Sequence, residues 1–235
     1  MRLRTFDINV NPMRQNKDFY MKSSVSIKEG LTVLVGCNGS GKTNFMTQIE
    51  NRLYFNDIPV IKYDNIRVGT YAKEWAMQRD DRVYMNIAAT SSEGENIVLN
   101  ISYLSKDIEY FITHNGEIRD DAFRVVNIFR KPDINKEEKP EADEFWVLID
   151  SIDSGLSIDN IIDLKKFLFD KIIKRVRDKG KKIYIIVSAN SYEMCRGEQC
   201  FDVRNGEYIT FSDYEEFRDF IILSKQNKTD REFNS

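Results

Sequence analysis

Three short runs of the chain are almost continuously apolar, at 31–35, 145–149 and 183–187. Runs of this kind are typical of strands that are buried on both faces of a mainly parallel sheet. Apolar residues at helical spacing follow the first run between 45 and 53, and follow the second between 158 and 176. Because buried strands alternate with amphipathic helices, the pattern predicts an α/β fold with a parallel core.

Other segments show the patterns of edge strands. Residues 1–10 and, more weakly, 18–28 alternate apolar and polar positions, which predicts two antiparallel strands. One or two short strands are expected within 58–71. The run at 83–90 is compatible with either a strand or a helix.

Further helices are indicated by spacing and by their end signals. They are expected at 72–82, from Ser92 to the Asn115-Gly116 pair, from a Ser157 cap to Gly180, and at 213–225. The segment 131–144 is charged and contains two prolines, so it is expected to form an exposed loop.

Composition limits the class of protein. The chain has 235 residues, of which 41% are hydrophobic and 31% are charged, and this length suits one α/β domain with elaborations. No apolar run approaches the roughly 18 residues that a membrane span needs. The N-terminus lacks the apolar stretch of a signal peptide. We therefore expect a cytoplasmic protein without a membrane partner.

Cysteine usage and overall charge bear on two further classes of protein. Three cysteines are an odd number at low density, which argues against a disulfide framework, and Cys195 and Cys200 lack the partners of a zinc site. A net charge of −3 does not indicate a nucleic-acid binder. The basic residues between 165 and 182 leave two interpretations open, a solvated helix face or a contact with a phosphate backbone.

A glycine-rich loop lies between the first buried strand and its helix. Its residues are Gly36, Cys37, Asn38, Gly39, Ser40, Gly41, Lys42 and Thr43, with Asn44 next in the helix. Glycines let backbone amides turn toward one point, where they chelate phosphate oxygens, and the helix N-terminus adds its dipole. Lys42 suits the β- and γ-phosphates, and the Thr43 hydroxyl suits Mg²⁺. The loop therefore predicts a site for ATP and Mg²⁺.

Asp150 is the second candidate for this site. It ends the apolar run 145–149, and ligands of parallel sheets bind at the carboxyl ends of the strands. A carboxylate there can hold Mg²⁺ through a water, opposite Thr43. The alternative is an aspartate that caps a turn.

Several segments together resemble one family. The loop at 36–43 looks like the GxNGxGK[ST] form of ABC-class ATPases, which include transporter motors and SMC- and RecF-type DNA-repair heads. Residues 147–157 are similar to that family's second nucleotide motif and D-loop, and 201–208 resemble its closing strand and Asn-Gly turn. The resemblance implies an α/β P-loop NTPase fold of the ABC/SMC type: a mixed sheet with a parallel core, an antiparallel edge and flanking helices.

In this family two heads enclose ATP, and each supplies a signature motif to the nucleotide of the other. Residues 91–95, Ser-Ser-Glu-Gly-Glu, resemble that signature, which implies that Ser92 and Gly94 contact the partner's nucleotide. The spacing of Ser92 and Glu95 is also that of an ordinary capping box. Gln78 is a candidate for the family's glutamine that senses Mg²⁺, with a solvated glutamine as the alternative.

The resemblance also implies the domain organisation. A single ABC-type ATPase domain would span residues 1–235. Because the signature lies far before Asp150, residues 116–144 are interpreted as an insertion. The segment 72–115 is interpreted as a reduced or altered helical segment.

Two positions depart from the family pattern. Ser151 stands where the family has its catalytic glutamate, and a hydroxyl does not replace a carboxylate base. Residues 187–190 occupy the place of the switch histidine, while the single histidine, His114, lies before Asp150.

Substitutes for these groups are available nearby. Asp153 is the candidate for a displaced base, and Ser188 or Asn190 are candidates for a hydrogen bond to the γ-phosphate. The expected catalytic positions are Lys42, Asp150, Ser151 and Asp153. We expect slow hydrolysis or none.

The expected function is ATP-gated homodimerisation in a DNA-related process or as a phage-encoded accessory protein, with DNA or another protein as a further partner. A non-enzymatic ATP-binding regulator of a protein partner is the first alternative. A transporter motor is the second, although the catalytic glutamate and the switch histidine that it needs are missing here.

Overall fold

The described part of the chain forms strands and helices in alternation. The computed structural model describes residues 3–11, 19–65, 82, 85–86, 90, 93–119 and 140–233. The strands are β1 (Leu3–Asp7), β2 (Ser24–Lys28), β3 (Gly30–Val35), β4 (Val60–Asp64), β5 (Glu144–Asp150), β6 (Lys182–Ser188), β7 (Cys200–Asp202) and β8 (Glu207–Ile209). The helices are α1 (Lys42–Phe55), α4 (Glu93–Thr113), α5 (Ile158–Leu164), the π-helical turn η1 (Lys165–Phe169), α6 (Asp170–Asp178), α7 (Tyr192–Cys195) and α8 (Tyr214–Phe233).

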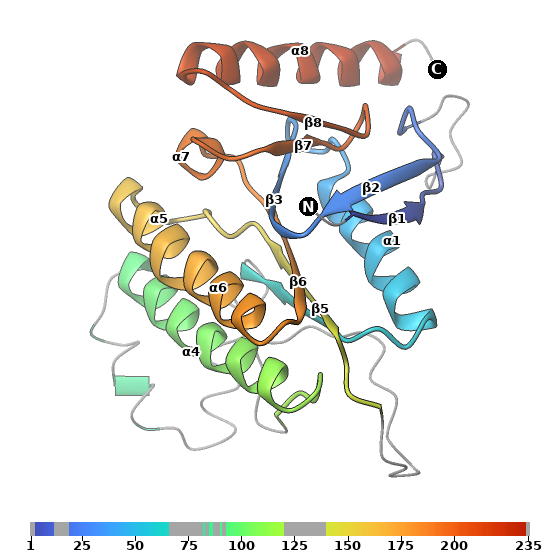
Figure 1. Ribbon diagram of the computed structural model, residues 1–235. Coiled ribbons are helices and arrows are strands. Elements are labelled where there is room, and N and C mark those ends of the chain that lie inside the picture. Colours follow the sequence, from blue (N-terminus) through green and yellow to red (C-terminus); the bar gives the residue numbers. More distant parts are fainter. Residues whose placement is uncertain are drawn as a thin grey trace.

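A six-stranded sheet in the order β4-β5-β6-β3-β7-β8 forms the centre, and β1 and β2 pair with each other in a separate antiparallel sheet (Figure 1). Within the larger sheet every pairing is parallel except that of β7 with the edge strand β8. The neighbours β5, β6 and β3 therefore end at the same edge of the sheet. Ligands of open α/β sheets bind at this edge.

Helices cover both faces of the sheet. Figure 1 shows α1 with β1 and β2 on one side, and α4, α5 and α6 on the other. Alternate residues of β5 divide between two cores, as the period of a strand requires. Trp146 and Leu148 pack in the core that contains α1, whereas Phe145, Val147 and Ile149 pack in the core that contains α4 to α6. Burial on both faces explains why the strand is a continuous apolar run.

The predicted α/β fold with a mixed sheet, parallel core, antiparallel edge and flanking helices is confirmed. The three apolar runs form β3, β5 and β6, and the helix expected from Ser92 to Asn115-Gly116 forms α4. Asn115 and Gly116 have φ angles of 54° and 86°, the left-handed geometry that ends a helix. Among the described residues of 83–90, Met85, Asn86 and Thr90 are helical.

Some boundaries differ from the prediction. The second alternating segment forms a strand only over β2. Before it, Met21 donates its backbone N–H to Arg204 O (2.8 Å), whereas Phe19 and Tyr20 donate theirs to Val10 O. The predicted 158–180 helix contains the π-helical turn η1. The final helix continues to Phe233 rather than ending at 225.

Ser157 precedes the helix as predicted, but its hydroxyl makes no capping hydrogen bond. That hydroxyl instead hydrogen-bonds the side chain of Asp159 and lowers the pKa of this carboxyl below its ordinary value. The helix expected at 72–82, apart from helical Arg82, lies outside the described residues, and so does most of the loop expected at 131–144.

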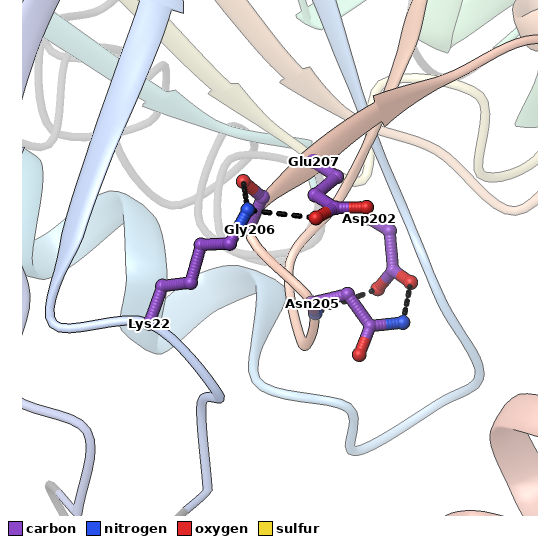
Figure 2. A network of polar contacts seen from close by, with 5 residues as sticks. All are labelled: Lys22, Asp202, Asn205, Gly206 and Glu207. Carbon is purple, nitrogen blue, oxygen red and sulfur yellow. Dashed lines mark hydrogen bonds and ion pairs between the residues drawn. The ribbon is translucent and has the colours of Figure 1, made fainter.

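The β7–β8 turn ties the N-terminal part of the chain to the sheet, as Figure 2 shows. Lys22 Nζ lies 2.8 Å from Glu207 Oε1, and Asp202 accepts hydrogen bonds from the backbone and side-chain nitrogens of Asn205. A Cβ at Gly206 would lie 3.2 Å from the Lys22 side chain. The segment that follows β1 is thereby fixed just beyond Tyr20.

A buried ion pair joins α1 to β4. Lys62 Nζ lies 2.8 Å from Glu50 Oε2, and the two side chains are only 7% and 3% exposed. Lys62 Nζ also donates to Thr47 Oγ1 at 3.1 Å. Because both partners are out of water, each needs the other for compensation of its charge. Within the described part of the chain, no helix is both long enough and apolar enough to cross a membrane.

Removing one member of this pair should therefore cost more than removing both. We expect Lys62→Met to lower the free energy of unfolding by about 3–5 kcal/mol, because Glu50 is left buried and uncompensated. Adding Glu50→Leu should recover most of that loss. Urea unfolding of the single and double variants measures both values. A double variant as unstable as the single one would show that the charges are not the source of the effect.

Candidate functional site

The loop between β3 and α1 has a backbone that glycine makes possible. Gly36, Gly39 and Gly41 have φ angles of 142°, 78° and 95°, values that residues with a side chain rarely adopt. At Gly41 there is also no room, since a Cβ would lie 2.1 Å from Phe19 Cε1 and 2.8 Å from the Tyr20 hydroxyl. Gly41 immediately precedes α1, so the loop delivers backbone amides to the start of a long helix.

Lys42 points back into this loop. Its ammonium donates to the backbone oxygens of Gly36 (2.7 Å) and Cys37 (3.3 Å), and to Asn190 Oδ1 (3.2 Å). Burial lowers the pKa of Lys42 below its ordinary value, and nearby acidic groups, among them Asp150, oppose that shift. The ammonium is thus held inside the curve of the loop, where an anion would recover the charge compensation that burial removes.

Asp150 brings three chain segments together. Its Oδ2 accepts a hydrogen bond of 2.6 Å from the Thr43 hydroxyl of α1, and its Oδ1 accepts one from the Ser188 hydroxyl at the end of β6. The Ser188 oxygen in turn accepts the Ser151 N–H at 2.8 Å. Asp150 is only 5% exposed. The predicted proximity of Asp150 to Thr43 is confirmed.

The loops after β5 and β6 are joined by Asp153. Its Oδ2 accepts the backbone N–H groups of Asn190, at 2.7 Å, and of Ser191. This fixes the segment that carries Asn190 to Lys42. Asp153 Oδ1 is buried and has no hydrogen-bond partner among the described residues. One carboxylate oxygen therefore orders the loop, and the other is open to a water or another donor.

Ser151, directly after Asp150, has an unusual backbone. Its φ angle is 55°, in the left-handed region that disfavours residues with a side chain. Asn65 Nδ2 donates to both Ser151 O and Ser154 O, each at 3.1 Å. The left-handed turn is thus held from β4 as well as from β6. Strain of this kind is found most often at functional sites.

Tyr20 supports the loop from the N-terminal side. Its hydroxyl donates to Gly41 O at 2.9 Å and lies 3.2 Å from Asn44 Oδ1. The side chain is 1% exposed and packs against Phe19 and Phe45. A ring buried in this way has no free face for stacking on a nucleobase, so its role here is to hold the first turn of α1.

These groups form a set that fits a phosphate and a divalent cation. Positive-φ glycines, the start of a helix and a buried ammonium are the donors that bind phosphate oxygens. The Ser40 hydroxyl in the loop is buried and has no hydrogen-bond partner among the described residues, so a donor is left over for a ligand. Thr43 and Asp150 present a hydroxyl and a carboxylate, the oxygen ligands that Mg²⁺ prefers.

For three candidate residues the described structure gives no position relative to this set. Gln78 and Ser92 lie outside the described residues. Gly94 is the second residue of α4, and the part of the structure that is described does not include its surroundings. Their predicted roles at Mg²⁺ and at a partner's nucleotide stay predictions.

Other contacts of the site were not predicted from the sequence. Asn65 follows the predicted strand within 58–71, so its position at a strand end was an available signal. Ser224 and Lys228 of α8 contact the backbone of the loop at Cys37 and Asn38, at 3.1 and 3.3 Å. No local pattern gives this approach, because it depends on where a C-terminal helix docks.

The Gly41 geometry is testable with a matched glycine. Gly180 has a φ angle of 73°, but a Cβ there would meet no atom within 4 Å. Gly180→Ala should cost about 1–2 kcal/mol for backbone strain alone. Gly41→Ala should cost about 1–3 kcal/mol more, because Phe19 and Tyr20 must move as well. Thermal and urea unfolding compare the two; equal losses would contradict the tight packing at Gly41.

No family model, curated protein or solved structure matches this chain. The fold class that the structure establishes is α/β with a mixed, mostly parallel sheet and flanking helices.

Proposed function

We propose that this chain is an ATP-binding protein of the ABC/SMC type that dimerises when ATP and Mg²⁺ are bound and hydrolyses ATP slowly. One observation carries the proposal. At the carboxyl edge of β3, β5 and β6, the neighbouring residues Lys42 and Thr43 bond two other segments: Lys42 Nζ donates to Asn190 Oδ1 at 3.2 Å, and Thr43 Oγ1 donates to Asp150 Oδ2 at 2.6 Å. The glycine-rich backbone beside them supplies amide donors.

The residues divide the work of binding. Lys42 would exchange the Gly36 and Cys37 oxygens for phosphate oxygens, which regains compensation for a buried charge. When bound, Mg²⁺ would neutralise phosphate charge and orient the terminal phosphate. The Thr43 hydroxyl would ligate the Mg²⁺, and Asp150 would hold the ion through a water. Ser188 keeps the Asp150 carboxylate oriented by donating to its other oxygen.

Slow hydrolysis is expected from the groups around Asp150. Ser151 offers no carboxylate to activate a water. Asp153 is the candidate carboxylate to replace the missing base, but its Oδ2 already accepts the Asn190 and Ser191 N–H groups. The other oxygen, Asp153 Oδ1, has no hydrogen-bond partner among the described residues, but it is buried, which disfavours a base role.

The second candidate is a non-enzymatic ATP-binding regulator of a protein partner, and Ser151 in place of a carboxylate favours it. A role on DNA draws less support from the basic segment at 165–182. Five of its charges pair with carboxylates, those of Lys165, Arg175, Arg177, Lys181 and Lys182. DNA-stimulated hydrolysis would favour the DNA-related role, and ATP-dependent association without turnover would favour the regulator.

Binding is tested by titration calorimetry with Mg-ATP. Lys42→Ala should weaken binding at least about tenfold, because it removes charge-assisted hydrogen bonds to the phosphates. Lys225→Ala is the control, since Lys225 is exposed on α8. Circular dichroism checks that both variants fold. Wild-type affinity in Lys42→Ala would contradict the proposed site.

Dimerisation is tested by light scattering with Mg-ATP, Mg-ADP or no nucleotide. Wild type should double its mass only with Mg-ATP, and Lys42→Ala and Ser92→Arg should stay monomeric. A wild type that remains monomeric at saturating ATP would refute the dimer.

Turnover is tested separately in a single-turnover assay. We expect a rate well below that of ordinary ABC motors, since Ser151 provides no base. A rate comparable to theirs would contradict the proposed lack of an efficient base.

A further inference from the structure

The C-terminal helix α8 is anchored beside the site by aromatic side chains. Phe217 is buried, with ring centroids 5.3 Å from Phe211 and 5.8 Å from Tyr192. Phe220 and Ile221 pack partly buried against the same core. The first half of α8 is therefore held by apolar contacts that do not involve the phosphate loop.

The second half of α8 places polar side chains on the loop. Phe217, Ile221, Ser224 and Lys228 follow each other at spacings of three or four residues, which puts them on one face of the helix. The opposite face is open to solvent, with Ile222 and Leu223 47% and 55% exposed. The same face of α8 thus packs through apolar side chains in the first half of the helix and contacts the phosphate loop through polar side chains in the second half.

These polar contacts are made with backbone groups of the loop. Ser224 Oγ accepts the Cys37 N–H at 3.1 Å, and Lys228 Nζ donates to Asn38 O at 3.3 Å. The next residue, Gly39, leaves room for the lysine, since a Cβ there would lie 2.6 Å from Lys228 Nζ. The helix therefore holds two successive residues of the phosphate loop, Cys37 and Asn38, through their backbone groups.

We propose that Ser224 and Lys228 are positioning residues for the phosphate loop, so that docking of α8 and binding of phosphate at the loop strengthen each other. A loop with three positive-φ glycines has many accessible conformations, and ordering it costs conformational entropy. Contacts that order the loop in the free protein reduce the cost left for binding. This inference rests on the proposed nucleotide site.

Coupling of this kind is reciprocal. If docked α8 raises the affinity of the loop for phosphate, then bound phosphate must stabilise the docking of α8 by the same factor. Each contact is a single hydrogen bond of ordinary net strength. Its loss should therefore weaken binding about fivefold.

The first experiment needs no nucleotide. Hydrogen exchange followed by amide NMR on the free protein measures protection of the Cys37 amide, which Ser224 accepts. Ser224→Ala and Lys228→Ala should speed exchange at 37–41, and Ser224→Thr and Lys228→Arg should restore protection. Lys225→Ala, an exposed lysine of the same helix, should change nothing.

The second experiment titrates the same variants with Mg-ATP. We expect about fivefold weaker binding for each alanine variant, recovery in Ser224→Thr and Lys228→Arg, and no effect of Lys225→Ala. In wild type, Mg-ATP should also slow exchange along 224–230. Unchanged affinity or unchanged loop exchange in both alanine variants would overturn the inference. If wild type does not bind Mg-ATP, the proposed function fails, whereas the exchange data still decide whether α8 orders the loop.

Discussion

The buried carboxylate of Asp150 is the constraint on which the site depends. It ends strand β5, and its two oxygens accept hydrogen bonds from Thr43 of α1 and Ser188 of β6. A carboxylate that is almost out of water requires such donors, because an uncompensated buried charge is costly. Satisfying Asp150 therefore fixes the start of α1 against the ends of two neighbouring strands.

The hydrogen bond between Thr43 and Asp150 also positions the neighbouring Lys42. Lys42 belongs to the first turn of α1, so this bond directs the ammonium into the loop. Asn190 reaches Lys42 because Asp153 holds the backbone after β6. Tyr20 and α8 then contact the loop at Gly41 and at Cys37–Asn38. The phosphate loop is thus held by neighbouring segments on several sides rather than by its own residues alone.

Much of the fold follows from local patterns in the sequence. Continuous apolar runs predict β3, β5 and β6 because these strands are buried on both faces, and parallel strands bring Asp150 near Thr43. Local patterns did not predict the course of 19–23, where Met21 bonds Arg204 while Phe19 and Tyr20 bond Val10. They also predicted the wrong role for the Ser157 hydroxyl, which hydrogen-bonds Asp159 instead of capping α5.

The contacts that order the loop were the least predictable part of the site. Tyr20, Ser224 and Lys228 reach it from distant positions, and their side chains carry no pattern that predicts a partner. Residue type and spacing indicate which chemistry a loop supports, whereas the groups that hold it depend on tertiary packing.

The most direct test of ATP and Mg²⁺ binding at this loop is amide NMR during titration with Mg-ATP. We predict that the largest shifts fall on the amides of 39–43, with smaller shifts at 188–190 and little change in β1 and β2. Saturable shifts that fall mainly on amides outside the loop, or no shifts at the loop at millimolar Mg-ATP, would contradict nucleotide binding at this loop.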